Sequence, residues 1–376
     1  MLFRSAMNEA GVTMALHQKF TPAFHPEGES IFSLASDLIS NVTSYHSLKK
    51  LIKDKKSITT WNLIFTFPDG QASSIDLSGD KLDERKFNLK DEKQYLCNFA
   101  QANWGKSELI LPLGIHSYNQ MRERSGQAKL KKFDVTKGSE LTLLKLMTTL
   151  KLKKGASAKN FELDCLTPSS LHAVVMNGKK SLMLASSGPA PKFYRTQYAQ
   201  IEAKLSNTRE HPSLKVVGKL KIPNISERGY RHMIDAQVCY DSLNRHGFYH
   251  HLQMAIACFE GLEIKMIGEF FLSTAFFLDT THTKERNMIL AEFQRLRPHL
   301  PDYLEQLCSL FIWRLERLMQ STPSVDIQQI KHEGLRKMAL AEEKMPANVL
   351  YGLLKSTAVI RLDVLDVIHP HLRLGS

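Results

Sequence analysis

The chain has 376 residues, 43% of them hydrophobic and 23% charged, so it can bury a core and is long enough for two or three domains. Its formal net charge of +12 favours an anionic partner, without choosing among a nucleotide, a nucleic acid and a membrane surface. The five cysteines are scattered without a Cys-x-x-Cys pair, which excludes the usual zinc and disulfide frameworks and indicates reduced thiols in a cytoplasmic protein.

The N-terminal part, residues 1–130, is expected to be an α+β region. Residues 33–52 carry leucine and isoleucine at approximate helical spacing, which predicts a helix. Residues 58–67 (ITTWNLIFTF) are rich in β-branched and aromatic residues and predict a strand. The Pro-Asp-Gly sequence at 68–70 favours a turn, so residues 72–77 are expected to return beside that strand as a hairpin.

A small β domain is expected over residues 131–189. Before it, residues 118–132 are polar and basic, which is typical of a linker or an exposed helix. Residues 139–152 are dense in apolar side chains, so helix and strand both fit, and the Lys-Lys-Gly that follows favours a helix that stops there. Turn residues separate three short runs that predict strands, at 161–166, 170–175 and 180–185.

No targeting or membrane-spanning segment is expected. No long apolar run follows the N-terminus, so the pattern of a signal peptide is missing. The longest apolar candidate, residues 268–278, is about half as long as the roughly 20 residues that a membrane span needs. These observations predict a cytoplasmic protein.

The middle of the chain contains a basic cluster, two strand-like runs and a polar turn. Pro191 to Arg195 (PKFYR) leads into the first run, residues 194–205, and the second run, residues 213–222, alternates between lysines and apolar residues. The second run ends at Asn-Ile-Ser-Glu-Arg-Gly, residues 224–229. Asn and Ser side chains can bond backbone or ligand from a turn, and Gly permits close approach.

This arrangement resembles the PilZ family, the β-barrel receptors for cyclic di-GMP. The signature of that family is Arg-x-x-x-Arg followed, two to three dozen residues later, by Asp/Asn-x-Ser-x-x-Gly. Arg195 matches the second arginine, and Asn224, Ser226 and Gly229 match the second half. The match is partial, because Pro191 stands where the first arginine is required.

The resemblance implies an α+β fold with an antiparallel PilZ-like barrel over residues 190–298. The small β domain over 131–189 would precede it, as in PilZ proteins of the flagellar-brake type, and a C-terminal helical region would cover 299–376. The barrel would continue beyond Gly229, although residues 241–259 also fit a helix. Its expected strands are 233–239, 252–259, 262–271 and 273–278.

The C-terminal region contains the clearest helical pattern in the chain, at residues 302–319, where leucines and a phenylalanine line one face behind a capping Asp302. Two further helices, over 325–343 and 347–367, follow Pro323 and Pro346. These two helices lie beyond the part of the chain that members of the family usually share, and they suggest an extension that binds a partner.

The ligand implied by the resemblance is cyclic di-GMP, bound by Lys192, Arg195, Asn224, Ser226 and Gly229. The implied function is a cyclic di-GMP-responsive protein that acts on flagellar motility or another surface-associated machine, located in the cytoplasm at the flagellar base. A flagellar motor protein or other membrane-machine protein would be its partner. The alternative is a degenerate scaffold that binds a protein or a nucleic acid without nucleotide.

No enzyme, metal or cofactor is expected. The chain contains no Gly-x-x-x-x-Gly-Lys, Gly-x-Ser-x-Gly or His-Glu-x-x-His motif, and its carboxylates are scattered, so no catalytic residue is nominated. His250, His251 and His282 are the candidate metal ligands. Adjacent histidines on a strand point to opposite faces, and no carboxylate is spaced to complete a site, so no metal site is predicted.

Overall fold

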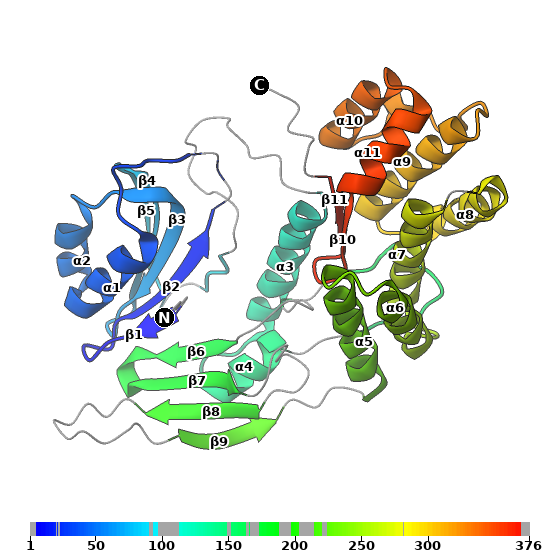
Figure 1. Cartoon of the computed structure of the whole chain (residues 1–376). Helices are drawn as coiled ribbons and strands as arrows, with labels where there is room; N and C mark the ends of the chain where they lie inside the picture. The colour runs from blue at the N-terminus through cyan, green and yellow to red at the C-terminus, as the bar shows by residue number, and fades with distance from the viewer. Residues whose placement is uncertain are drawn as a thin grey trace.

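The computed structural model shows two larger antiparallel sheets and a large helical part that includes a two-stranded sheet, and one long helix lies between them (Figure 1). The structure describes residues 5–19, 21, 23–89, 93–96, 113–148, 152–162, 165, 173–187, 197–202, 214–219, 224–280 and 282–369.

A five-stranded antiparallel sheet forms the N-terminal part, and its strands lie side by side in chain order: β1 (Ser5–Met7), β2 (Thr13–Gln18), β3 (Ser57–Thr66), β4 (Gln71–Gly79) and β5 (Lys81–Asn88). The β3–β4 pair confirms the hairpin predicted over residues 58–77. Thr66 faces Ala72 beside the turn, and the register continues so that Asn62 faces Asp76.

Two helices cover one face of this sheet, on the side away from the helical part (Figure 1). They are α1 (Ile31–Asn41) and α2 (Tyr45–Ile52), and they replace the single helix predicted over 33–52. The break has a local cause: Ser44 accepts a hydrogen bond from the Ser47 backbone N–H (3.2 Å) and so starts a new helix. The apolar residues of both helices pack against Met14, Leu63, Phe65, Ile75 and Leu77 of the sheet.

A four-stranded antiparallel sheet has the order β6 (Val174–Asn177), β7 (Leu182–Ser187), β8 (Gln197–Glu202) and β9 (Leu214–Lys219). Helix α4 (Glu140–Thr148), which confirms the helix predicted over 139–152, packs on this sheet. The Thr148 and Tyr198 hydroxyls lie 2.6 Å apart beside the buried Leu144 and Leu184. This sheet is open at both edges among the described residues.

Helix α3 (Leu113–Lys132) lies between the sheets and the helical part (Figure 1). Residues 118–132 thus form a helix and not a linker. Tyr118 and Met121 of α3 are buried in the same core as helix α9 (Asp302–Leu318).

The helical part is built on a large aromatic core in which Phe270, Phe277, Phe293 and Phe311 contact one another. Among the described helices, none is long and apolar enough to cross a membrane. The helices are α5 (Asn224–Asp241), α6 (Arg245–Cys258), α7 (Ile264–Asp279), α8 (Thr283–Leu296), α9 (Asp302–Leu318), α10 (Glu333–Glu343) and α11 (Ala347–Thr357).

The predicted PilZ-like barrel over residues 190–298 is wrong. Of its described residues, the strands β8 and β9 belong to the open sheet, and 224–296 form four helices with short connections. In α5 the buried Tyr230, Met233 and Ala236 recur every three residues, which is a helical period. Helix α7 is apolar on nearly all sides because it is buried, so its sequence could be mistaken for a buried strand.

The C-terminal predictions are partly confirmed. Helix α9 matches the helix predicted over 302–319. The helix predicted over 347–367 ends at Thr357, and β10 (Val359–Arg361) and β11 (Asp366–Ile368) form an antiparallel hairpin after it. The β-branched residues Val359, Ile360, Val367 and Ile368 favour strands over a continued helix.

Candidate functional site

The five-stranded sheet has one apolar and one polar face, because alternate residues of a strand point to opposite sides. In β3, Leu63 and Phe65 belong to the core that α1 and α2 cover. Asn62, which precedes Leu63, and Thr60, two residues before Asn62, therefore lie on the other face. In β4 the same reasoning places Ser74, Asp76 and Ser78 there. We call these five residues, Thr60, Asn62, Ser74, Asp76 and Ser78, the polar face.

The polar face is buried. A polar sheet face normally meets water, yet Asn62 is 0% exposed, Asp76 is 3% exposed, and the other three residues are also buried. Figure 1 shows α1 and α2 on the opposite side of the sheet, so other parts of the chain cover this face. Burying polar side chains costs free energy unless they are hydrogen-bonded, so hydrogen-bond partners are expected for all five residues.

Asn62 is the centre of the hydrogen bonding on this face. Its Nδ2 donates to Asp76 Oδ1 (2.7 Å) and to Ser74 Oγ (2.8 Å). An ionised carboxylate only accepts, so the contact with Asp76 fixes which end of the Asn62 amide is the nitrogen. The other end, Oδ1, is buried and has no hydrogen-bond partner among the described residues. One fixed acceptor is thus left open in the interior.

A chain of hydroxyl groups borders this centre. The Thr21 and Thr60 hydroxyls are hydrogen-bonded, Thr60 Oγ1 lies 2.8 Å from Ser78 Oγ, and Ser78 Oγ lies 3.4 Å from His25 Nε2. Each hydroxyl can donate and accept, so the chain connects the half-buried His25 with the buried Thr60. This arrangement provides a path along which hydrogen bonds can be re-oriented toward a bound molecule.

Ionisable side chains also lie in this part of the sheet, one of them buried and one half-buried. Lys19 follows β2, is buried, and donates a backbone hydrogen bond to the Thr60 carbonyl oxygen (3.1 Å). His17 of β2 faces Asn62 in the β2–β3 register. Buried ionisable groups are uncommon and cluster at sites that bind or react. Together with Asp76 they make the polar face the best candidate for a functional site.

The chemistry that this site permits is the binding and orientation of a small polar molecule away from bulk water. The Asn62 Oδ1 atom and the Asp76 carboxylate accept hydrogen bonds, and the hydroxyl groups do either. No grouping of three metal ligands occurs on this face among the described residues; such a grouping, of His232, Asp235 and His251, lies on α5 and α6.

The residues predicted to bind cyclic di-GMP are not gathered on a strand turn. Lys192 and Arg195 lie outside the described residues. Asn224, Ser226 and Gly229 lie in the first turns of α5, where Ser226 is buried and the Phe259 ring packs against Gly229. Their role in binding a ligand stays a prediction that the structure does not test.

Sequence reasoning passed over the polar face, although a signal was present. Asn and Asp are depleted in strands, yet Asn62 and Asp76 stand in the middle of two well-defined strand sequences. The Pro-Asp-Gly turn also fixes the register that brings them opposite each other. What the hairpin alone could not reveal is that the rest of the chain covers this face.

Comparisons with known proteins identify no family. No family model matches the chain, and no curated protein matches it. Among solved structures, it is similar to penicillin V acylase from Agrobacterium tumefaciens, with a TM-score of 0.37 and 13% identity over 58% of this chain and 78% of that one. It is also similar to a variant of conjugated bile acid hydrolase from Clostridium perfringens, with a TM-score of 0.32 and 13% identity over 59% of this chain and 80% of that one.

The structure corrects the functional expectations that followed from the PilZ resemblance. Those expectations rested on a PilZ-like barrel, which the described residues do not form, so a cyclic di-GMP receptor, motility signalling and a PilZ-like scaffold are no longer supported. The expectation that the chain is not an enzyme is withdrawn as well; the solved structures reported above are named as an acylase and a hydrolase. TM-scores of 0.32 and 0.37 are too low to assign a shared fold or a particular reaction to this chain.

Proposed function

We propose that the polar face binds a small molecule that donates a hydrogen bond from an N–H group to Asn62 Oδ1. The observation that supports this is the buried and unpartnered Oδ1 atom, whose orientation is fixed by the Asn62–Asp76 contact. An unpaired buried acceptor costs about 1–3 kcal/mol. A ligand donor at this position would remove that cost, and a structural role for the amide would not explain why one end is left open.

The ligand class follows from the groups that surround this acceptor. Asn62 Oδ1 and the Asp76 carboxylate both accept, so a ligand that offers several N–H donors, such as a primary amide or an amine, complements them. The enclosure of the face by the rest of the chain favours a small ligand or a small group at the end of a larger one.

The experiment uses acetamide as the probe and N,N-dimethylacetamide, which has no N–H, as its matched control. Saturation-transfer NMR on the full chain is expected to show transfer to acetamide and much weaker transfer to the dimethyl compound. The Asn62→Leu variant, which keeps a similar volume, is expected to lose the acetamide signal. Asn119→Leu provides the variant control, because Asn119 is a buried asparagine of α3 with one amide atom unpartnered.

Equal transfer to both probes would contradict the proposal, since the N–H would then not matter. So would a signal that persists in Asn62→Leu, or the absence of any acetamide signal in the wild-type chain. That last outcome would favour an ordered water molecule as the partner of Asn62 Oδ1. Circular dichroism of each variant shows whether the comparison is made on folded protein.

We also propose a cytoplasmic location for this function. The four described cysteines, Cys165, Cys239, Cys258 and Cys308, are thiols that form no disulfide. Free thiols persist where the compartment is reducing, and structural disulfides are common in secreted proteins. Alkylation of intact cells compared with lysed cells, followed by mass spectrometry of the four cysteine peptides, tests this assignment: thiols already oxidised in the cell would contradict it.

A further inference from the structure

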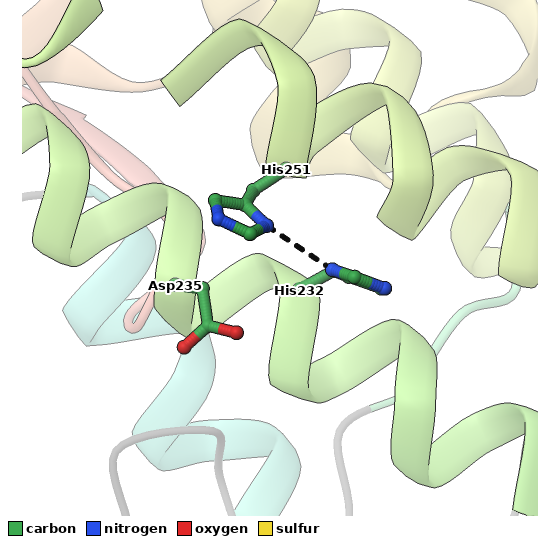
Figure 2. A group of neighbouring side chains, drawn as sticks. All are labelled: His232, Asp235 and His251. Carbon is green, nitrogen blue, oxygen red and sulfur yellow. Dashed lines mark hydrogen bonds between the residues drawn. The ribbon is translucent and has the colours of Figure 1, made fainter. Parts of the chain in front are cut away.

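A second cluster of chemistry-bearing side chains lies far from the polar face, between α5 and α6. His232 and Asp235 are three residues apart on α5 and therefore share one face of that helix. His251 comes from α6, which packs along α5. Figure 2 shows the three side chains converging on the space between the two helices.

The spacing of their ligand atoms suits one metal ion. His232 Nδ1 and His251 Nδ1 lie 3.2 Å apart, and the ligand atoms of all three residues lie within 4.8 Å of one another. Two nitrogen ligands at the usual zinc distance of about 2.0–2.1 Å and a tetrahedral angle are roughly 3.4 Å apart. The two histidines are thus already at a coordinating distance, and the carboxylate needs only a small side-chain movement to join them.

The helices hold these residues in place. Met233 and Ala236 on α5 and Phe248 and Leu252 on α6 are buried in the core of the helical part. The three ligand residues themselves are half-buried, so they stand at the edge of a fixed helix pair that an ion can reach. Ligands carried by packed helices are better positioned than ligands on loops.

The facing imidazole nitrogens also suit a metal ion. Two imidazole nitrogens that face each other at this distance can share at most one proton, whereas both can donate a lone pair to a cation.

We propose that His232, Asp235 and His251 form a site for a divalent transition-metal ion such as Zn²⁺. Two imidazoles and one carboxylate are the ligand types that such ions prefer over Mg²⁺ or Ca²⁺. Three protein ligands leave a fourth coordination position to water or to an exogenous ligand, as in zinc sites that are not closed. The site does not depend on the function proposed for the polar face.

Isothermal titration of the full chain with ZnCl₂, after removal of any histidine tag, tests the proposal. We expect one ion per chain for the wild type, and loss of that binding in His232→Ala, His251→Ala and Asp235→Asn. His250→Ala is the matched control: His250 is exposed and adjacent to His251 on α6 but does not belong to the group. It should bind Zn²⁺ as the wild type does, and MgCl₂ should not compete.

Substitution of Co²⁺ for Zn²⁺ supplies a second readout that does not depend on affinity. Visible d–d absorption of Co²⁺ in the wild type, lost in His251→Ala and kept in His250→Ala, would support a site with these ligands. Zn²⁺ affinity that is equal in the wild type and in the three ligand variants would overturn the proposal, because the ion would then be adventitious. A loss in His250→Ala as large as that in His251→Ala would overturn the ligand assignment.

Discussion

The side chain of Asp366, on β11, accepts a hydrogen bond from the backbone N–H of Gly114, in the first turn of α3, with a nitrogen–oxygen distance of 2.9 Å. The two residues are 252 positions apart in the sequence. Asp366 also accepts from the Val367 N–H (2.8 Å) and is 1% exposed. A carboxyl group thus caps the helix that links the sheets to the helical part, beside the buried Tyr303 of α9.

The first prediction concerns the pH dependence of stability that this carboxyl group causes. Burial raises the pKa of Asp366 to about 7, against the backbone N–H groups of Gly114, Val367 and Ile115, which lower it. A carboxyl group whose pKa is higher in the folded than in the unfolded chain makes the protein most stable when it is protonated. Its contribution therefore falls as pH rises from about 4 to about 7, by roughly 1.4 kcal/mol per pH unit, and is constant above that.

The measurement is urea unfolding of the wild type and Asp366→Asn over that pH range. Other groups titrate as well, so the quantity to compare is the difference in the free energy of unfolding between the two proteins. Wild type should lose stability relative to Asp366→Asn as pH rises. A constant difference across the range would mean that Asp366 stays ionised in the folded protein.

The second prediction concerns the buried ion pair between Arg314 of α9 and Glu342 of α10. Arg314 Nε lies 2.8 Å from Glu342 Oε2, a second nitrogen of the guanidinium contacts Oε1, and both side chains are buried. Removing one partner leaves a charge in the interior, so Glu342→Leu and Arg314→Met should each cost about 3–5 kcal/mol of the free energy of unfolding. The double variant should cost much less than the sum, because no charge is then stranded.

Chemical denaturation of the four proteins as a double-mutant cycle measures this coupling. Lys337 and Glu333 supply the comparison, since they form an exposed ion pair on α10. The same cycle on that pair should give less than about 1 kcal/mol. Equal coupling energies for the buried and the exposed pair would show that burial does not set the strength of the Arg314 contact.

The third prediction addresses the Asn62–Asp76 contact of the polar face. Asn62→Asp replaces the donor that lies 2.7 Å from Asp76 Oδ1 with a second acceptor. Two buried carboxylates this close share a proton, so the pKa of the pair rises. The variant should therefore lose stability relative to wild type as pH rises from about 4 toward 8. Thermal unfolding across that range checks it, and a penalty that does not change with pH would show that the new carboxylate is solvated.

The hairpin from 57 to 79 shows how far local sequence determines this fold. Its strands, its turn and even the pairing of Asn62 with Asp76 follow from β-branched residues and a Pro-Asp-Gly turn. The burial of its polar face does not follow, because it depends on segments distant in the sequence. The site could therefore be located only after the whole chain was folded.

The region from 224 to 296 shows the opposite outcome. The short motif Asn-x-Ser-x-x-Gly predicted a turn between strands. The structure instead has helix α5 there, and the buried residues after the motif recur with a helical period. Short motifs recur by chance in unrelated proteins. The spacing of apolar residues over a whole helix is more informative about the fold, because it reflects which face of the helix is buried. The His232–Asp235–His251 cluster depended on that helix, since three residues' separation brings side chains together on a helix but not on a strand.

The last prediction uses the glycine of that motif. Gly229 lies inside α5, where alanine would raise helix stability by roughly 0.5–1 kcal/mol. A Cβ atom at Gly229 would lie 2.4 Å from Cε1 of Phe259, a ring that is buried and in contact with Tyr230. The ring cannot withdraw without disturbing this packing, so Gly229→Ala should be destabilising, with overpacking costing about 1–3 kcal/mol.

Gly352→Ala is the matched control, because Gly352 lies inside α11 and a Cβ atom there would meet nothing within 4 Å. Gly352→Ala should raise the free energy of unfolding only by the higher helix propensity of alanine over glycine. Urea unfolding of the wild type and both variants should therefore move the midpoint in opposite directions. The double variant Gly229→Ala/Phe259→Leu should lose less stability than the two single substitutions added together, because the smaller leucine leaves room for the new methyl group. If Gly229→Ala stabilised the chain as Gly352→Ala does, close packing of α5 on Phe259 would be excluded as the reason for a glycine at this position.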